Sequence, residues 1–225
     1  MYYYYSFIVI IPALFFAIYA QFKVKKNYEI YSRVSSGGLT GAMAAERLLR
    51  ANGIQDVKIE QVQGHLSDHF DPRTNVIRLS EGVYNGSSVA AVGIACHEAG
   101  HACQHAENYF PIKIRNAIIP VTRIGSALGV PLALIGFFLN QGVLIDIGLI
   151  LYATIAVFQL ITLPVEFNAS SRALKVIGEQ HMLGDEQYTG AKKVLQAAAL
   201  TYVAALISSL ATLLRLLLIF NRRRD

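Results

Sequence analysis

The sequence predicts a mostly α-helical, polytopic membrane protein with about four membrane helices and a small αββα unit between the first and the second of them. Two observations lead to this fold class. Hydrophobic residues make up 54% of the 225 residues and gather in long runs, and about 20 consecutive apolar residues suffice to cross a bilayer. Between the first two runs the composition becomes that of an ordinary soluble segment. This segment contains both helical and strand-like patterns of apolar residues.

Four apolar runs approach the length of a membrane helix. The first has no charged residue before it and is followed by Lys23, Lys25 and Lys26, which is the reverse of a signal peptide. We therefore expect an uncleaved helix, with the tyrosines at positions 2–5 at one membrane interface. The runs divide the chain into a membrane helix at 1–22, a mixed region at 23–115, a membrane helical hairpin at 116–163, a polar helix and loop at 164–196, and a membrane helix with a basic end at 197–225.

The mixed region is predicted to fold as helix, strand, strand and helix. Residues 40–51 are helix formers that end at Asn52-Gly53, a common helix stop. Residues 56–62 alternate apolar and polar side chains as a half-buried strand does, and residues 75–79 are the second strand candidate. Residues 64–72 are too rich in turn formers to be regular. Ser87 or Ser88 then caps a helix that runs to about Glu107.

The last of these helices contains the sequence His97-Glu98-Ala99-Gly100-His101. Residues at i and i+4 project side by side from a helix, so His97 and His101 can present ring nitrogens to one zinc ion at about 2.0–2.1 Å. Glu98 begins at the edge of the same face, where it can take a proton from a water at the metal. This H-E-x-x-H pattern is typical of zinc metalloproteases, in which the glutamate is the general base.

A catalytic zinc needs three protein ligands, and Glu166 is the best candidate for the third. His105 continues the i+4 series, but it lies about 12 Å along the helix axis from His97, which is too far for one ion. Glu166 follows the third apolar run directly, and two membrane crossings return the chain to the side that it left after His101. The remaining candidates on that side are Glu179, Asp185 and Glu186.

Two further pairs of residues, histidines and cysteines, carry reactive side chains. His65 and His69 precede the second strand and are the nearest candidates in sequence for an oxyanion donor, although a turn held by local hydrogen bonds explains them better. Cys96 and Cys103 lie about 10 Å apart along one helix, too far for a disulfide, so we expect two reduced packing residues.

Four segments of the chain resemble the YugP-type neutral zinc metallopeptidases of bacteria, and more distantly the HtpX-type and CAAX prenyl membrane proteases. These segments are DHFDP at 68–72, VIRLSEGVY at 76–84, HEAGHACQ at 97–104 and EFNASSRA at 166–173. The resemblance implies a gluzincin site with His97, His101 and Glu166 as zinc ligands and Glu98 as the base. The HtpX-type pattern places an aspartate four residues after its glutamate ligand, whereas this chain has Ser170, a weaker partner for a zinc-bound histidine.

These observations predict a zinc-dependent metallopeptidase of the membrane that cuts a peptide or membrane-protein substrate. The strand at 75–79 is the candidate for pairing with an extended substrate. The alternative is a zinc-binding scaffold or a pseudoprotease without turnover. The intact Glu98 argues against a pseudoprotease, and a structural zinc site would ordinarily be closed by four protein ligands.

Charge distribution indicates a lipid bilayer, not a nucleic acid, as the large partner. The net charge is +5, but the basic residues flank the apolar runs. Counting Lys and Arg near the membrane ends places the mixed region in the cytoplasm, because Arg222, Arg223 and Arg224 alone fall on the other side. The ten on the side of the mixed region are Lys23, Lys25, Lys26, Arg33, Lys113, Arg115, Arg172, Lys175, Lys192 and Lys193.

Overall fold

The computed structural model describes residues 7–65 and 67–220. The tyrosines at positions 2–5 and the arginines at 222–224, to which roles were assigned above, lie outside these residues. The chain forms two compact units. The first, the apolar unit, comprises Met1–Gln21, Lys113–Pro164 and Leu200–Asp225; the second, the mixed unit, comprises Phe22–Ile112 and Val165–Ala199.

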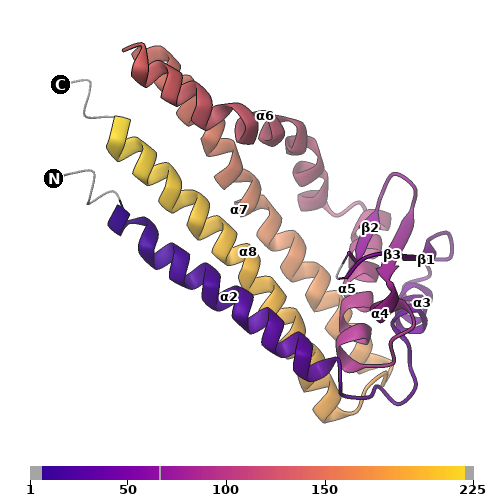
Figure 1. Ribbon diagram of the computed structural model, residues 1–225. Coiled ribbons are helices and arrows are strands. Elements are labelled where there is room, and N and C mark those ends of the chain that lie inside the picture. The colour runs from indigo at the N-terminus through magenta and orange to yellow at the C-terminus, as the bar shows by residue number, and fades with distance from the viewer. Residues whose placement is uncertain (1–6, 66, 221–225) are drawn as a thin grey trace. The chain divides into compact units, whose positions relative to one another are not determined.

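The mixed unit contains a sheet of three strands, one more than the αββα prediction (Figure 1). The strands are β1 (Lys58–Val62), β2 (His69–Asp71) and β3 (Val76–Ser80), in the order β1-β3-β2. β1 runs parallel to β3, whereas β2 runs antiparallel to it. β2 lies within residues 64–72, which were predicted to be irregular, so that prediction is wrong for these three residues. Three residues among turn formers are too few to show the alternating pattern of a strand.

Three helices of the mixed unit pack with this sheet: α3 (Gly41–Ala51), α4 (Glu81–Tyr84) and α5 (Val89–Ala106). The predicted cap of α5 is confirmed at Ser88, whose hydroxyl accepts from Ala91 N–H. A second cap, which was not predicted, begins α3, where the Thr40 hydroxyl accepts from Met43 N–H. Each such bond satisfies a backbone donor that the first helical turn leaves free. Large fully buried side chains of α3, β3 and α5 form the core, among them Leu48, Ile77, Leu79 and Val92.

The motifs that carry the resemblance are joined by hydrogen bonds within this unit. Asp68 accepts from both the backbone N–H and the hydroxyl of Ser80, at 2.8 and 3.0 Å. Asp71 accepts from the Arg78 guanidinium at 2.9 Å. These bonds connect the DHFDP segment to the VIRLSEGVY segment. The carboxylates of Asp68 and Asp71 therefore hold β2 against β3 in addition to the backbone pairing of the two strands.

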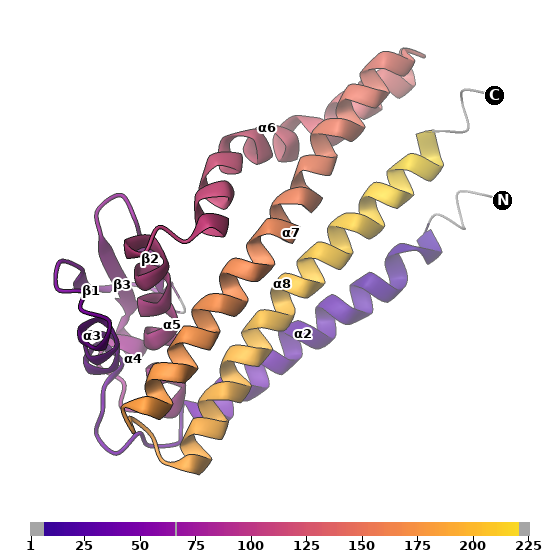
Figure 2. The ribbon, with the colours of Figure 1, turned by 180° about the vertical axis from the view of Figure 1, so that it is seen from behind.

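Four long helices complete the fold: α2 (Ile10–Tyr31), α6 (Phe110–Phe138), α7 (Gly142–Glu179) and α8 (Asp185–Phe220). Among the described residues, α6, α7 and α8 are long and apolar enough to cross a membrane. The structure therefore supports three of the four predicted membrane helices, and α2 is not among them. The polar segment predicted at 164–196 is no separate element. α7 passes through Pro164 without a break and ends at Glu179, and α8 begins at Asp185 (Figure 2).

Within the apolar unit, glycines allow α6 and α7 to approach closely. A Cβ atom on Gly129 would lie 2.9 Å from the backbone nitrogen of Tyr152, and one on Gly136 would lie 2.7 Å from that of Ile145. Small residues at such contacts are typical of helices packed in a membrane. Large apolar side chains of the same helices remain exposed, with Phe138 at 80% and Val143 at 69%, as expected of surfaces that contact lipid.

Candidate metal centre

α5 supplies two of the histidines that the sequence singled out. His97 and His101 lie one turn apart, with their ring centroids separated by 4.7 Å and the rings nearly perpendicular. Both side chains are largely buried, at 13% and 11% exposure. Glu98, on the same helix, is buried as well. The helix thus holds two imidazoles and a carboxylate in a protected setting.

α7 brings Glu166 against both histidines. Its Oε2 atom lies 3.3 Å from His97 Nε2 and 3.4 Å from His101 Nε2, and one ligand atom from each of the three residues falls within 4.8 Å of the others. Ligands at about 2.1 Å around a tetrahedral zinc lie about 3.4 Å from one another. Two nitrogens and one carboxylate oxygen at this spacing fit a zinc ion.

Gly100 makes this approach of α7 to α5 possible. A Cβ atom there would lie 2.6 Å from the carbonyl oxygen of Ala169 and 3.2 Å from its Cα. Only a residue without a side chain lets the backbone of α7 come so near. The glycine of the HEAGH sequence therefore has a packing role that the spacing of the histidines does not reveal, since it depends on a residue 69 positions later.

Each histidine has a polar partner on the nitrogen that faces away from Glu166. His97 Nδ1 lies 3.1 Å from the Ser170 hydroxyl, and His101 Nδ1 lies 3.0 Å from Gln104 Oε1. Ser170 occupies the place that the sequence comparison with the HtpX-type pattern gave to an aspartate, and it does reach the histidine. Gln104 lies in the HEAGHACQ segment and was given no role from the sequence; its position three residues after His101 on the helix is the signal that points to one.

The buried carboxylate of Glu98 is held by the sheet. The backbone N–H of Phe70, in strand β2, donates to Glu98 Oε2 at 3.0 Å. Because β2 is an edge strand of the sheet, this N–H leaves the ladder to meet α5. The strand nearest the metal centre is therefore β2. The predicted substrate strand at 75–79 corresponds to β3, which is paired on both sides and cannot accept another strand.

The charges of the centre raise the pKa of His101. Burial acts to lower this pKa, but the hydrogen bond with Glu166 and the negative charges of Glu98 and Glu166 outweigh it. When the His101 ring is protonated on both nitrogens, a cation that binds Nε2 has to displace a proton, so metal binding weakens as the pH falls. Near the end of α5, the pKa of Glu107 is lowered by its hydrogen bond to Arg172.

The alternative candidates lie elsewhere in the mixed unit. Among the described residues, the only cluster of side chains that could hold a metal ion is His97, His101 and Glu166. Glu179, Asp185 and Glu186 are not members of this cluster. His69 Nδ1 bonds the Ser67 carbonyl at 2.8 Å, as the turn interpretation predicts. His65 contacts the Tyr28 ring edge to face at 5.4 Å. Cys96 and Cys103 are free and buried, and burial raises the pKa of Cys103 to about 11.

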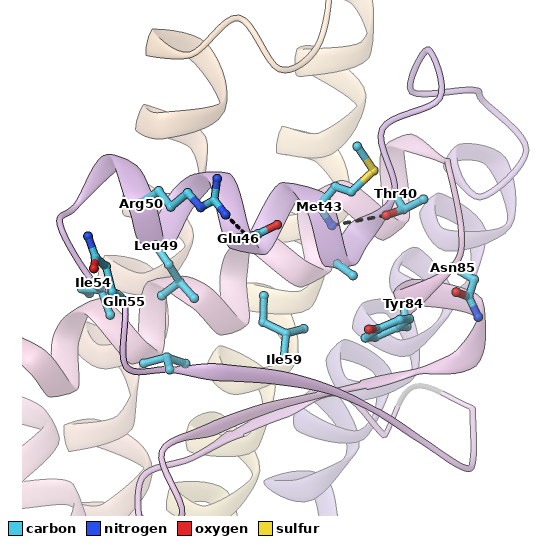
Figure 3. Close-up of a pocket in the computed structure, with 12 residues that line it drawn as sticks. Thr40, Met43, Glu46, Leu49, Arg50, Ile54, Gln55, Ile59, Tyr84 and Asn85 are labelled. Carbon is cyan, nitrogen blue, oxygen red and sulfur yellow. Dashed lines mark hydrogen bonds and ion pairs between the residues drawn. The ribbon is translucent and has the colours of Figure 1, made fainter.

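A separate cavity of about 980 Å³ lies between α3, β1 and α4 (Figure 3). Leu49, Ile54 and Ile59 form part of its wall, and the Arg50–Glu46 ion pair and the Asn85 amide contribute polar groups. None of the residues of the metal centre lines it. The cavity is consequently no part of the candidate active site.

Comparison with known proteins identifies the class to which this fold and site belong. Residues 6–221 match the family described as "putative neutral zinc metallopeptidase", and the chain belongs to this family. The chain is also 50% identical over 216 residues to the "Putative membrane protease YugP" of Bacillus subtilis (strain 168), covering 96% of each chain. No solved structure gives a significant match.

Proposed function

We propose that this protein is a membrane-bound zinc metalloprotease in which His97, His101 and Glu166 hold the metal and Glu98 is the general base. The observation that carries this proposal is the spacing of Glu166 Oε2, 3.3 and 3.4 Å from the two Nε2 atoms. Three protein ligands with a mixed nitrogen and oxygen set are typical of catalytic zinc sites, whereas structural sites have four. Membership of the zinc metallopeptidase family supports the same assignment.

A bound zinc supplies Lewis acidity, which polarises a peptide carbonyl and makes a water acidic enough to attack near neutral pH. Glu98 takes the proton of the attacking water and returns it to the nitrogen of the leaving amine. Its burial keeps this proton from bulk solvent. The Phe70 N–H fixes the direction of the Glu98 carboxylate, so that the base is oriented before substrate arrives.

The substrate is an extended peptide or a segment of a membrane protein that lies along β2. This strand is at the edge of the sheet and contacts Glu98 through Phe70. An extended chain can pair with a strand edge whatever its sequence, here through backbone groups of β2 other than the Phe70 N–H, which is donated to Glu98. We place the reaction at the cytoplasmic face of the cell membrane, following the distribution of Lys and Arg, with the lipid bilayer as the partner of the apolar helices.

Metal content and cleavage together test this proposal. The full-length protein in detergent should carry about one zinc per chain, and Glu166→Ala should reduce that content sharply. Glu98→Gln should keep the zinc and lose cleavage of an unfolded substrate such as casein, because it removes a base and no ligand. Glu179→Ala is the matched control and should behave as wild type in both measurements.

The outcomes separate the alternatives. Full zinc content in Glu166→Ala would refute the third ligand. Zinc binding without cleavage by the wild-type protein, across soluble and membrane-embedded substrates, would favour a zinc-binding scaffold or a pseudoprotease. Cleavage that persists in Glu98→Gln would refute the role of Glu98 as the base.

A further inference from the structure

Gln104 is a fully buried amide that uses all of its hydrogen-bonding groups between α5 and α7. Its exposure is 0%. Its Oε1 atom lies 3.0 Å from His101 Nδ1, and its Nε2 atom donates to the Val165 carbonyl at 2.7 Å and to Asn168 Oδ1 at 2.9 Å. A buried polar group with complete partners is costly to disturb, and every partner here lies beside the metal centre.

The direction of these bonds follows from groups that can act in only one way. The Val165 carbonyl can only accept, so the NH₂ group of Gln104 must face it. The Arg172 guanidinium can only donate, and its Nε lies 2.7 Å from Asn168 Oδ1. Asn168 therefore presents its oxygen to both Arg172 and Gln104. The oxygen of the Gln104 amide therefore faces His101.

The same polarity fixes the protonation of His101. Because Gln104 offers an oxygen, the His101 Nδ1 atom must carry the proton of their hydrogen bond. The Nε2 atom is then the nitrogen available to a metal, and it is the one directed at Glu166. This series of hydrogen bonds begins at Arg172, whose guanidinium also donates two hydrogen bonds to the Glu107 carboxylate, both at 2.7 Å.

We propose that Gln104 is a positioning residue that fixes the tautomer and ring orientation of His101 and ties them to the position of the third ligand. The tie arises because the carbonyl that orients Gln104 belongs to Val165, the residue immediately before Glu166. A shift of α7 that moved Glu166 would therefore also disturb the partner of His101. This inference rests on the proposed zinc site and deepens it by naming the residue that orients one of its ligands.

Zinc affinity of the full-length protein in detergent tests this role. Gln104→Leu keeps much of the side-chain volume and removes both the acceptor and the donor. Loss of a partner of a metal-binding histidine typically weakens metal binding by about 10- to 100-fold, and we expect that range in competition with a chromophoric chelator. Val83→Ala is the control, because Val83 is fully buried in the same unit and is not a member of the metal group.

A spectroscopic readout separates positioning from loss of stability. The visible absorption bands of bound Co²⁺ should shift in Gln104→Leu, whereas Val83→Ala should lower the unfolding temperature and leave affinity and spectrum unchanged. Wild-type affinity and spectrum in Gln104→Leu would overturn the proposal. So would equal losses of zinc affinity in both variants.

A measurement on the wild-type chain remains decisive even if Gln104→Leu does not fold. In zinc-loaded protein with ¹⁵N-labelled histidine, the His101 shifts should show a metal on Nε2 and a hydrogen-bonded proton on Nδ1. Coordination through Nδ1 would overturn the proposal. None of these readouts involves hydrolysis, so a chain that binds zinc in this way and cuts no peptide would refute the proposed function and leave the role of Gln104 intact.

Discussion

Replacing Phe70 by proline tests whether the edge strand β2 orients Glu98, the proposed general base. Proline has no backbone N–H, so the substitution removes the hydrogen bond that Phe70 N–H donates to Glu98 Oε2 at 3.0 Å. The substitution suits the position, since proline is found on edge strands where the N–H points away from the ladder. It also favours an extended residue before it, which His69 in β2 already is.

The expected loss follows from the charge of the acceptor. A hydrogen bond to an ionised group contributes about 1.5–3 kcal/mol, which corresponds to about 10- to 150-fold in kcat/KM at about 1.4 kcal/mol for each factor of ten. Phe70→Pro should therefore cleave casein less efficiently by that factor, and its zinc content should equal that of wild type because no ligand is changed.

Phe70→Ala is the matched control. It removes the ring, which lies 5.7 Å from that of His105, and keeps the N–H. We expect this variant to retain most of the wild-type kcat/KM. Equal activity of the proline and alanine variants, whether high or low, would refute the reasoning, because only the N–H distinguishes them. Loss of zinc in Phe70→Pro would show that the strand had moved and would likewise contradict it.

Three further predictions concern packing, pH and sidedness. Gly100→Ala should abolish zinc binding or unfold the mixed unit, because its Cβ would lie 2.6 Å from the Ala169 carbonyl oxygen; a zinc titration showing wild-type affinity would contradict this. The pKa of Asp71 is lowered from 3.8 to about 2, chiefly by its hydrogen bond from Arg78. The stabilising effect of the Asp71–Arg78 pair is therefore complete above about pH 4 and disappears as the pH falls through about 2. The difference in unfolding temperature between wild type and Asp71→Asn should shrink between these pH values. A difference that stays constant would exclude the ion pair as the source of the stabilisation. Glu186→Cys, at an exposed position, should resist an impermeant maleimide in intact cells and react after permeabilisation; labelling in intact cells would place the mixed unit outside the cytoplasm.

Local chemistry explains which parts of the fold the sequence could predict. Ser88 predicts the start of α5, because a capping hydroxyl bonds a backbone group only three residues away. α3 was predicted from its helix formers and from the stop at Asn52-Gly53. The strand candidates at 56–62 and 75–79 match β1 and β3, each of which extends over five residues. The apolar runs likewise predict α6, α7 and α8, although not that α7 and α8 include the neighbouring polar segments.

The candidate centre was only partly predictable because its parts depend on distant contacts. The i and i+4 spacing brings His97 and His101 together within one helix, and the order of the apolar runs favoured Glu166 as a partner for them. Nothing local marks Gly100, whose neighbour is Ala169, or the pairing of Gln104 with Val165. β2 was missed because only its position between β3 and α5 gives three residues their regular structure.

The separation of Glu166 from the two histidines has a consequence for how the protein is made in the cell. His101 leaves the ribosome 65 residues before Glu166, and the chain between them contains α6 and the apolar part of α7. A nascent or truncated chain that lacks these helices has the histidines and the base but no carboxylate to complete the centre. Under the proposed zinc site, hydrolytic capacity appears only after the helical hairpin has been synthesised, so a chain that ends before Glu166 cannot cut a peptide by this mechanism.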